Sequence, residues 1–269
     1  MDLTVRRAGA LEYLTAPALA GSIHCFSTRF GGVSEGALAS LNLGTHRGDR
    51  PENVLANYRL LGRAVGFRPE QTVFTKQEHT AIVRVTAAAD CGTGLLREAQ
   101  DVCDGRITDE PGVALCCFSA DCTPVLLFDP VRQAAGAVHA GWRGTAKGIV
   151  KAAVEAMQDA YGCRPENICA AIGPCIGLCC FEVGPEVARA MREALGPEAE
   201  PALRRCGEKY HVDLKLLNRI WLARAGVRRV DVSSACTMCS PERFWSHRVT
   251  GGVRGSLAAV IMLKGGEEP

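Results

Sequence analysis

The 269-residue sequence lacks both a large excess of one charge sign and long apolar runs, and each absence excludes a class of protein. Neither charge sign dominates: 31 lysines and arginines face 29 aspartates and glutamates, so no overall field draws the chain onto nucleic acid or an anionic membrane. Long apolar runs are missing too, since even ALCCFSADCTPVLLF is broken by Asp121 and stays below the roughly 20 residues that span a bilayer. We therefore expect neither a nucleic-acid nor a membrane partner.

The amino-acid composition is typical of a soluble globular domain. Hydrophobic residues make up 47% and charged residues 22%, which excludes a disordered chain, a coiled coil and a collagen-like polymer. No repeat, low-complexity tract or linker divides the sequence. We therefore expect one domain over residues 1–269.

Fourteen cysteines are many for this length and raise the question of disulfides. The start of the chain, Arg6-Arg7 followed by AGALEYLTAPALAGS, imitates a signal peptide, but Glu12 and Tyr13 interrupt its apolar stretch. We expect a cytoplasmic protein with reduced thiols. The neighbouring pairs Cys116-Cys117 and Cys179-Cys180 are expected to fill the core.

Hydrophobic periodicity alternates between strand and helix along the chain. Several neighbouring strands have no helix between them, which predicts an α/β protein with mixed sheets. The expected strands are 22–28, 73–74, 81–85, 113–118, 124–128, 134–138, 168–172, 229–232 and 257–263. The expected helices are 51–65, 149–161, 185–195 and 214–225.

Histidine is scarce, with six residues, so each can be weighed. His79 lies in the polar loop TKQEHT between two predicted strands, and Cys122 and His139 stand at predicted strand ends. Two imidazoles and one thiolate suit Zn²⁺, and three protein ligands with an open fourth position are the catalytic pattern. Hydrogen-bonded loop histidines and a buried cysteine explain the same residues, and no local CxxC or HExxH motif decides between the two interpretations.

Other motifs carry less information. Gly32-Val33-Ser34-Glu35-Gly36 matches the G-x-S-x-G pattern of a nucleophile elbow, but no helix follows it, so a loop turn is expected. Cys236-Thr237-Met238-Cys239 is a CxxC without a partner motif, a weak sign of metal or redox chemistry.

Three arginines lie in glycine-rich turns, where the backbone can approach a ligand closely. They are Arg29 in FSTRFGG, Arg143 in HAGWRG and Arg248 in SHRVTGG. A guanidinium binds phosphate or carboxylate through two parallel hydrogen bonds, although solvated surface arginines are also common. Trp142 has a ring that suits stacking on a base or anchoring its loop.

Eight segments together give the sequence a recognisable identity at the level of the family. FSTRFGGVSEG, SLNLGTHRGD with PENVLANYR, TKQEHT, DGRIT, SADCTPVLLFD, AVHAGWRGT, IGPCIGLCCFEVG and CTMCSPERFWSHR resemble, in order, the laccase-domain or YfiH-like family. The resemblance implies a layered α/β/β/α fold with mixed sheets. It also implies zinc ligands at His79, Cys122 and His139.

The resemblance implies roles for further residues. Catalytic roles fall on Cys122, His139, Arg29 and Arg143, and substrate contacts on Asn42, Gln77, Asp104, Trp142 and Arg248. The family's TGR segment reads GVRGS here, which places Arg254 slightly out of register.

The implied activity is phosphorolysis of adenosine, inosine and S-methyl-5'-thioadenosine, with adenosine deamination as a second reaction. A laccase needs a blue-copper site and a three-copper cluster, which six dispersed histidines without an H-x-H motif cannot supply. Cu²⁺ is expected at the three-ligand site only adventitiously. Two alternatives stay open: a hydrolase that edits peptidoglycan precursors with Cys122 as nucleophile and His139 as base, and a non-enzymatic metal-binding or partner-binding protein.

Overall fold

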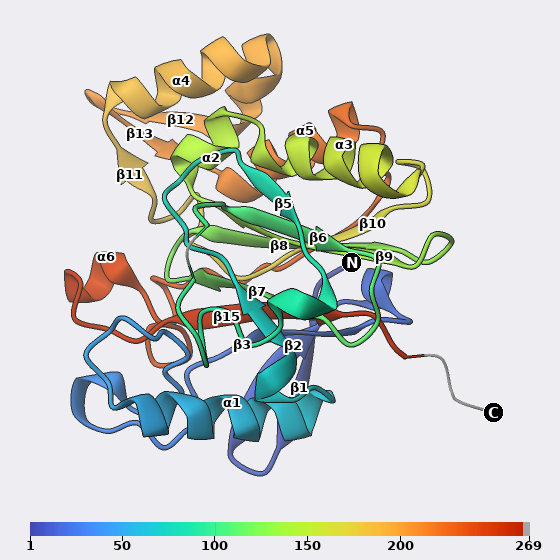
Figure 1. Cartoon of the computed structure of the whole chain (residues 1–269). Coiled ribbons are helices and arrows are strands. Elements are labelled where there is room, and N and C mark those ends of the chain that lie inside the picture. Colours follow the sequence, from blue (N-terminus) through green and yellow to red (C-terminus); the bar gives the residue numbers. More distant parts are fainter. Residues whose placement is uncertain (100, 266–269) are drawn as a thin grey trace.

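Two six-stranded β-sheets face each other in the centre of the structure, and helices cover both outer sides (Figure 1). The structure is a computed structural model that describes residues 1–99 and 101–265. The first sheet has the order β1 (Thr4–Ala8), β2 (Leu11–Thr15), β3 (Ile23–Ser27), β15 (Leu257–Met262), β7 (Ala114–Ser119) and β4 (Thr72–Phe74). The second has the order β14 (Arg229–Val232), β10 (Cys169–Ile172), β8 (Thr123–Asp129), β9 (Ala134–Ala140), β6 (Gly105–Thr108) and β5 (Val83–Val85).

Both sheets are mixed, as the sequence predicts. Parallel pairing occurs between β4 and β7, β10 and β14, and β5 and β6, while the other strand pairs of these sheets are antiparallel. A small third sheet has the order β11 (Glu182–Val183), β13 (Lys209–Val212) and β12 (Leu203–Cys206).

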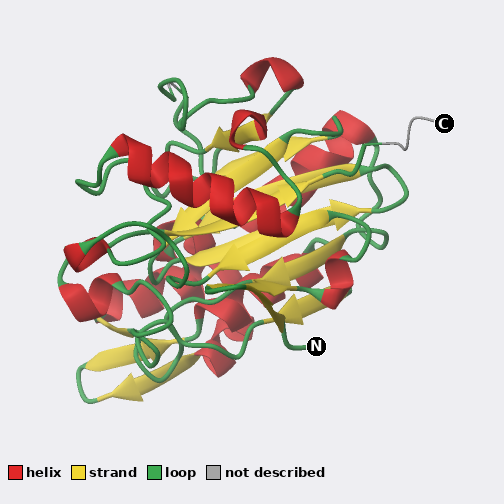
Figure 2. Cartoon of the chain, turned by 90° about the horizontal axis from the view of Figure 1, so that it is seen from below, coloured by secondary structure: helices red, strands yellow, loops and turns green. Residues whose placement is uncertain are grey.

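The helices form the outer layers. They are α1 (Pro51–Val65), α2 (Trp142–Ala146), α3 (Ile149–Tyr161), α4 (Pro185–Leu195), α5 (Leu214–Arg224) and α6 (His247–Thr250). Helix α1 begins with Pro51, whose missing N–H costs nothing in a first turn, and ends at Gly66 in the left-handed conformation with φ of 108°. It lies across the first sheet, as the view from below shows (Figure 2).

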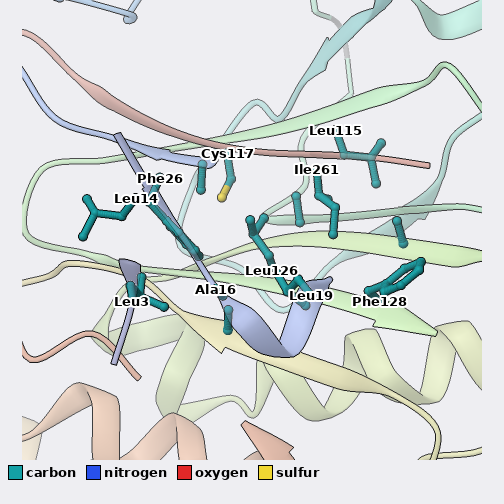
Figure 3. Packing of buried hydrophobic residues seen from close by; sticks show 14 of the residues in the cluster. Leu3, Leu14, Ala16, Leu19, Phe26, Leu115, Cys117, Leu126, Phe128 and Ile261 are labelled. Atoms are coloured by element: carbon teal, nitrogen blue, oxygen red, sulfur yellow. The ribbon is translucent and has the colours of Figure 1, made fainter. Parts of the chain in front are cut away.

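The main core lies between the two sheets. Phe26, Leu115 and Ile261 of the first sheet pack with Leu126 and Phe128 of the second, all nearly without solvent exposure (Figure 3). Helices α3 and α5 bury apolar residues against the other face of the second sheet. The predicted α/β/β/α layering is therefore confirmed, and every predicted helix and strand has a counterpart in the structure.

The differences concern short strands and one cysteine pair. The signal-peptide-like start is the antiparallel hairpin β1–β2, and β6 and the small sheet were not predicted. Cys116 and Cys117 are buried as expected, but Cys179 is exposed and Cys180 half-buried, so the expectation that this second pair fills the core is wrong. No helix in the described part of the chain has the length and apolarity to cross a membrane.

Candidate metal centre

One end of the second sheet gathers the three expected metal ligands. His139, near the end of β9, pairs in register with Pro124 of β8, and Cys122 directly precedes β8. His79 lies in the loop between β4 and β5. The strand order thus brings together residues that are up to 60 positions apart in the sequence.

The distances within this group are those of a metal site. The ligand atoms of His79, Cys122 and His139 all lie within 4.8 Å of one another. Cys122 Sγ is 3.7 Å from His79 Nε2, and a tetrahedral zinc ion would hold such a pair about 3.6 Å apart. His139 is buried while the other two side chains are half-buried, so the group can hold a metal ion and leave one side open.

Asp104 forms hydrogen bonds with the His139 ring and with the loop that carries His79. Its buried carboxylate is 2.8 Å from His139 Nδ1, and it accepts backbone N–H groups from Glu78, His79 and Thr80 as well as the Thr80 hydroxyl. The bond at Nδ1 leaves His139 Nε2 as the ring nitrogen for a metal, and the backbone bonds fix the loop that carries His79. A carboxylate behind a ligating histidine is the usual second layer of a metal site.

The charges of this group reinforce one another. Burial raises the pKa of Cys122, but attraction to His139 and hydrogen bonds with His139 and His79 outweigh burial and lower that pKa to about 6. Burial lowers the pKa of His139, yet Cys122 and Asp104 raise it to about 9. Asp104 loses solvation too, but its hydrogen bonds with His139 and Thr80 lower its pKa to about 2. The centre therefore favours a thiolate, the form of cysteine that binds metals and attacks electrophiles.

Asp121 fixes the position of Cys122 and was missed as a site residue. Its φ of 87° is left-handed, a sparsely populated conformation for a residue with a side chain. The carboxylate accepts the Thr237 hydroxyl at 2.6 Å and the Arg248 backbone N–H at 2.7 Å. Asp121 thus ties two distant loops to the residue before Cys122; an Asp in a strand-end turn, SADCT, is the only signal that the sequence offers.

Gly141 marks a close approach of the backbone to the centre. A Cβ at this position would lie 2.4 Å from His79 Cδ2 and 3.3 Å from Cys122 Sγ. Any side chain here would displace the His79 ring, because the 2.4 Å contact is shorter than real Cβ atoms tolerate. The glycine of the HAGWRG segment is therefore required by the packing of the centre itself.

Three arginines lie on segments that adjoin the centre or act on it electrostatically. Arg143 lies two residues after Gly141, is exposed and stacks on half-buried Trp142, with its Cζ 4.2 Å from the ring centroid. Arg248 is joined to the centre through the bond of its backbone to Asp121, and its guanidinium lies over Phe181.

Arg254 is the third, and its register was in doubt from the sequence. It is buried, and its Nε has no hydrogen-bond partner in the described part of the chain. Burial lowers the pKa of Arg254 to about 10, the charge of Arg47 acts in the same direction, and Asp121 and Cys122 oppose it. A buried guanidinium next to a second arginine, with a nitrogen still unpaired, is an arrangement that an anion would stabilise.

The remaining expected residues are engaged with the protein. Arg29 donates to the carbonyls of Pro241 and Ala39 and stacks on Trp245, and no described contact joins it to the metal ligands. Asn42 is buried, and its side-chain NH₂ group donates to Gly44 and Asp49 while its side-chain oxygen accepts the backbone N–H groups of Gly44 and Ser256. Gln77 is half-buried, and its amide bonds to the backbone of Phe118 in β7. The contacts of all three hold the surrounding loops in place, and Asp104 does the same from its buried position.

Comparisons with known proteins agree with this architecture. A family model described as multi-copper polyphenol oxidoreductase laccase matches residues 23–264. The chain is 39% identical to the purine nucleoside phosphorylase YlmD of Geobacillus stearothermophilus, covering 91% of this chain and 92% of that protein. It is 40% identical to a purine nucleoside phosphorylase of Deinococcus radiodurans, covering 95% and 94%. The crystal structure of the Geobacillus YlmD superposes with a TM-score of 0.91 at 37% identity, covering 97% of this chain and 99% of that one.

Proposed function

The chain belongs to the family described as multi-copper polyphenol oxidoreductase laccase, and from that membership and the geometry of the centre we propose that it is a zinc-dependent purine nucleoside phosphorylase. The proposed substrates are adenosine, inosine and S-methyl-5'-thioadenosine, with adenosine deamination as a second activity. The observation that carries the proposal is the meeting of His79, Cys122 and His139 at one end of the second sheet.

The residues present fit a zinc ion. Two imidazole nitrogens and one sulfur are ligands that Zn²⁺ prefers, and their separation matches tetrahedral coordination with one position left for a substrate or water. When bound, the ion would supply a Lewis acid that polarises a substrate oxygen or lowers the pKa of water to about 7.

The chain's own residues would prepare the reaction by positioning. Asp104 keeps His139 Nδ1 protonated and hydrogen-bonded, which directs Nε2 towards the centre. The same carboxylate and Gly141 fix the place of the His79 ring. Both histidines are thus held before any substrate arrives, which reduces the reorganisation that the reaction requires.

The phosphate would bind through the arginines. In phosphorolysis a phosphate oxygen bonds to the ribose C1', the bond from C1' to the base nitrogen breaks, and the base leaves with that electron pair and takes up a proton. Arg254, with its unpaired Nε, and Arg143 on the exposed side offer charge-assisted hydrogen bonds that hold phosphate for this attack.

Arginine variants test the phosphate site. Arg143→Ala should raise the KM for phosphate and leave the zinc content unchanged, because the guanidinium is not a metal ligand. Arg132→Ala is a matched control, since Arg132 bonds to Gly162 at the far end of β8. An unchanged KM for phosphate in Arg143→Ala would remove Arg143 from the site.

Deamination at the same centre would release ammonia from adenosine. Water would add to the purine carbon that bears the amino group, and the amino group would leave as ammonia. His79→Ala should abolish ammonia release together with phosphorolysis if both reactions use this centre. Retention of one reaction alone would assign it to another part of the protein.

The contact between Cys122 and the two histidines also favours a second candidate, a thiol hydrolase that acts on peptidoglycan precursors. The Cys122 thiolate would attack a carbonyl carbon, and the leaving group would depart with the proton held by His139. Water, giving a proton to His139, would then cleave the acyl–cysteine thioester and restore the thiolate. A chelator distinguishes the candidates. Loss of nucleoside cleavage on zinc removal supports the phosphorylase, whereas turnover of a peptidoglycan precursor by metal-free protein supports the hydrolase.

The laccase in the family's description is not expected as the main activity. Of the metal-binding groups formed by described residues, one alone contains two histidines. Oxygen reduction by a laccase requires a three-copper cluster in addition to its blue-copper site. Copper bound in place of zinc would give a coloured copper–thiolate species with weak oxidase activity, which metal analysis and absorption spectroscopy would detect.

A further inference from the structure

Four cysteines form a second cluster that the proposed function does not use. Cys179 and Cys180 lie in the turn before β11, and Cys236 and Cys239 lie in the loop after β14. Their four sulfurs are all within 4.8 Å of one another. The two pairs are more than 50 residues apart in the sequence, so the fold has brought them together.

The geometry of the cluster is that of one central ion. Cys239 Sγ lies 3.5 Å from the sulfur of Cys179 and 3.4 Å from that of Cys180. A disulfide joins two sulfurs at about 2.05 Å and cannot account for one sulfur placed equally near two others. The edges of a zinc–sulfur tetrahedron are about 3.8 Å, as follows from a Zn–S bond of about 2.3 Å, so a small adjustment would seat the ion.

One sulfur of the cluster accepts a hydrogen bond from the backbone. The Gly177 N–H donates to Cys236 Sγ at 3.2 Å, a bond that negative charge on sulfur strengthens. A Cβ on Gly177 would lie 3.2 Å from Cys179 Sγ and 3.3 Å from Cys236 Cβ, so glycine leaves room for the cluster. Buried Lys215 donates to the carbonyls of Ser233 and Ala235 and so fixes the loop directly before Cys236.

We propose that Cys179, Cys180, Cys236 and Cys239 bind a second zinc ion as a closed, structural site. Four thiolates occupy all four positions of the tetrahedron, so this ion has no open position for a substrate. Its role is to fasten the turn before β11 to the loop after β14.

The fastened segments form part of the wall of the first centre. Thr237, between the two cysteines of the loop, bonds to Asp121 beside Cys122. Phe181, next to Cys180, packs under the Arg248 guanidinium, with Arg248 Cζ 5.6 Å from the ring centroid. Loss of the second zinc should therefore loosen the loop around Asp121 without removing any ligand of the first centre.

The test counts and identifies metals in the whole protein, reconstituted under reducing, oxygen-free conditions. Wild type should hold about two zinc ions per chain, and Cys239→Ser and Cys179→Ser about one each. Both variants replace exposed side chains, and circular dichroism would verify their folds. Cys91→Ser, which changes a half-buried cysteine that belongs to neither group of ligands, should retain about two zinc ions.

Cobalt identifies which centre is filled. Cobalt in a four-thiolate site absorbs strongly through sulfur-to-metal charge transfer, and this spectrum should persist in His79→Ala and disappear in Cys239→Ser. If the first centre alone fails to bind zinc, wild type would hold about one zinc ion per chain, which His79→Ala leaves in place and Cys239→Ser removes. Three results would overturn the proposal. The first is an unchanged cobalt spectrum and zinc content in Cys239→Ser and Cys179→Ser. The others are a wild type with no zinc beyond that lost with His79→Ala, and a disulfide within the cluster in protein isolated without oxygen.

Discussion

Replacing Asp104 by asparagine tests how the first centre is held together. In the native chain Oδ1 accepts from His139 Nδ1 and the His79 N–H, while Oδ2 accepts from Glu78 N–H and from both donors of Thr80. An asparagine has one acceptor oxygen and one NH₂ group. Placing the oxygen towards Thr80 preserves the larger set of bonds and turns the NH₂ group towards His139.

This orientation changes the histidine. His139 Nδ1 must then accept a hydrogen bond, so the neutral ring carries its proton on Nε2, the nitrogen that faces the metal position. Zinc binding has to reverse this tautomer, and the His79 N–H loses its acceptor. We expect zinc affinity to fall about 10-fold to 100-fold, or about 1.4 to 2.8 kcal/mol, although all three ligands are present.

A competition titration with a fluorescent zinc chelator would measure the effect of Asp104→Asn. Asp129→Asn is a matched control, because Asp129 is a buried aspartate at the other end of β8 that caps the backbone of Val131 and Arg132. The control should lose stability but keep its zinc affinity. A zinc affinity of Asp104→Asn within twofold of wild type, with the fold intact, would refute the positioning role of Asp104.

Other predictions follow from the same contacts. Gly141→Ala should weaken zinc binding at least about tenfold in the chelator titration, because its Cβ would collide with the His79 ring, and an unchanged affinity would show that the loop yields. In steady-state assays, Arg254→Lys should raise the KM for phosphate about tenfold with zinc content unchanged, because lysine keeps the charge but lacks the planar guanidinium. A change in kcat alone would contradict this prediction. Thiol titration of reduced, zinc-loaded protein should show rapid reaction at Cys206 and slow reaction at the four-cysteine cluster until a chelator is added, and equal rates before and after chelation would contradict the second site.

The layers of the fold could be predicted because its longer elements carry strong local signals. Helix α1 has a proline start, a glycine end and a buried stripe of Val54, Tyr58 and Leu61. Strands β8 and β9 are continuous apolar runs that end in polar turns. The small sheet was missed because β12 and β13 are largely exposed and carry no clear apolar alternation, and their inward residues pack against α4.

The sequence could indicate which three side chains meet at the candidate centre but not the contacts that support them. Cys122 and His139 stand at strand ends and His79 in the loop between β4 and β5, and the sequence marks all three places as polar. The positioning roles of Asp104 and Asp121 depend on hydrogen bonds to segments up to 127 residues away, and no local pattern reports these bonds. The four-cysteine cluster was missed for the same reason, since each half resembles an ordinary pair of cysteines until the fold joins them.

The measurement that tests the central claim most directly is the phosphate dependence of inosine cleavage by the zinc-loaded protein. We predict that hypoxanthine forms only when phosphate is present, with one ribose 1-phosphate for each hypoxanthine, and that Cys122→Ala, which lacks a metal ligand, forms neither product. Equal rates of hypoxanthine release with and without phosphate, with free ribose as the second product, would contradict phosphorolysis, and the absence of release under both conditions would contradict the substrate class.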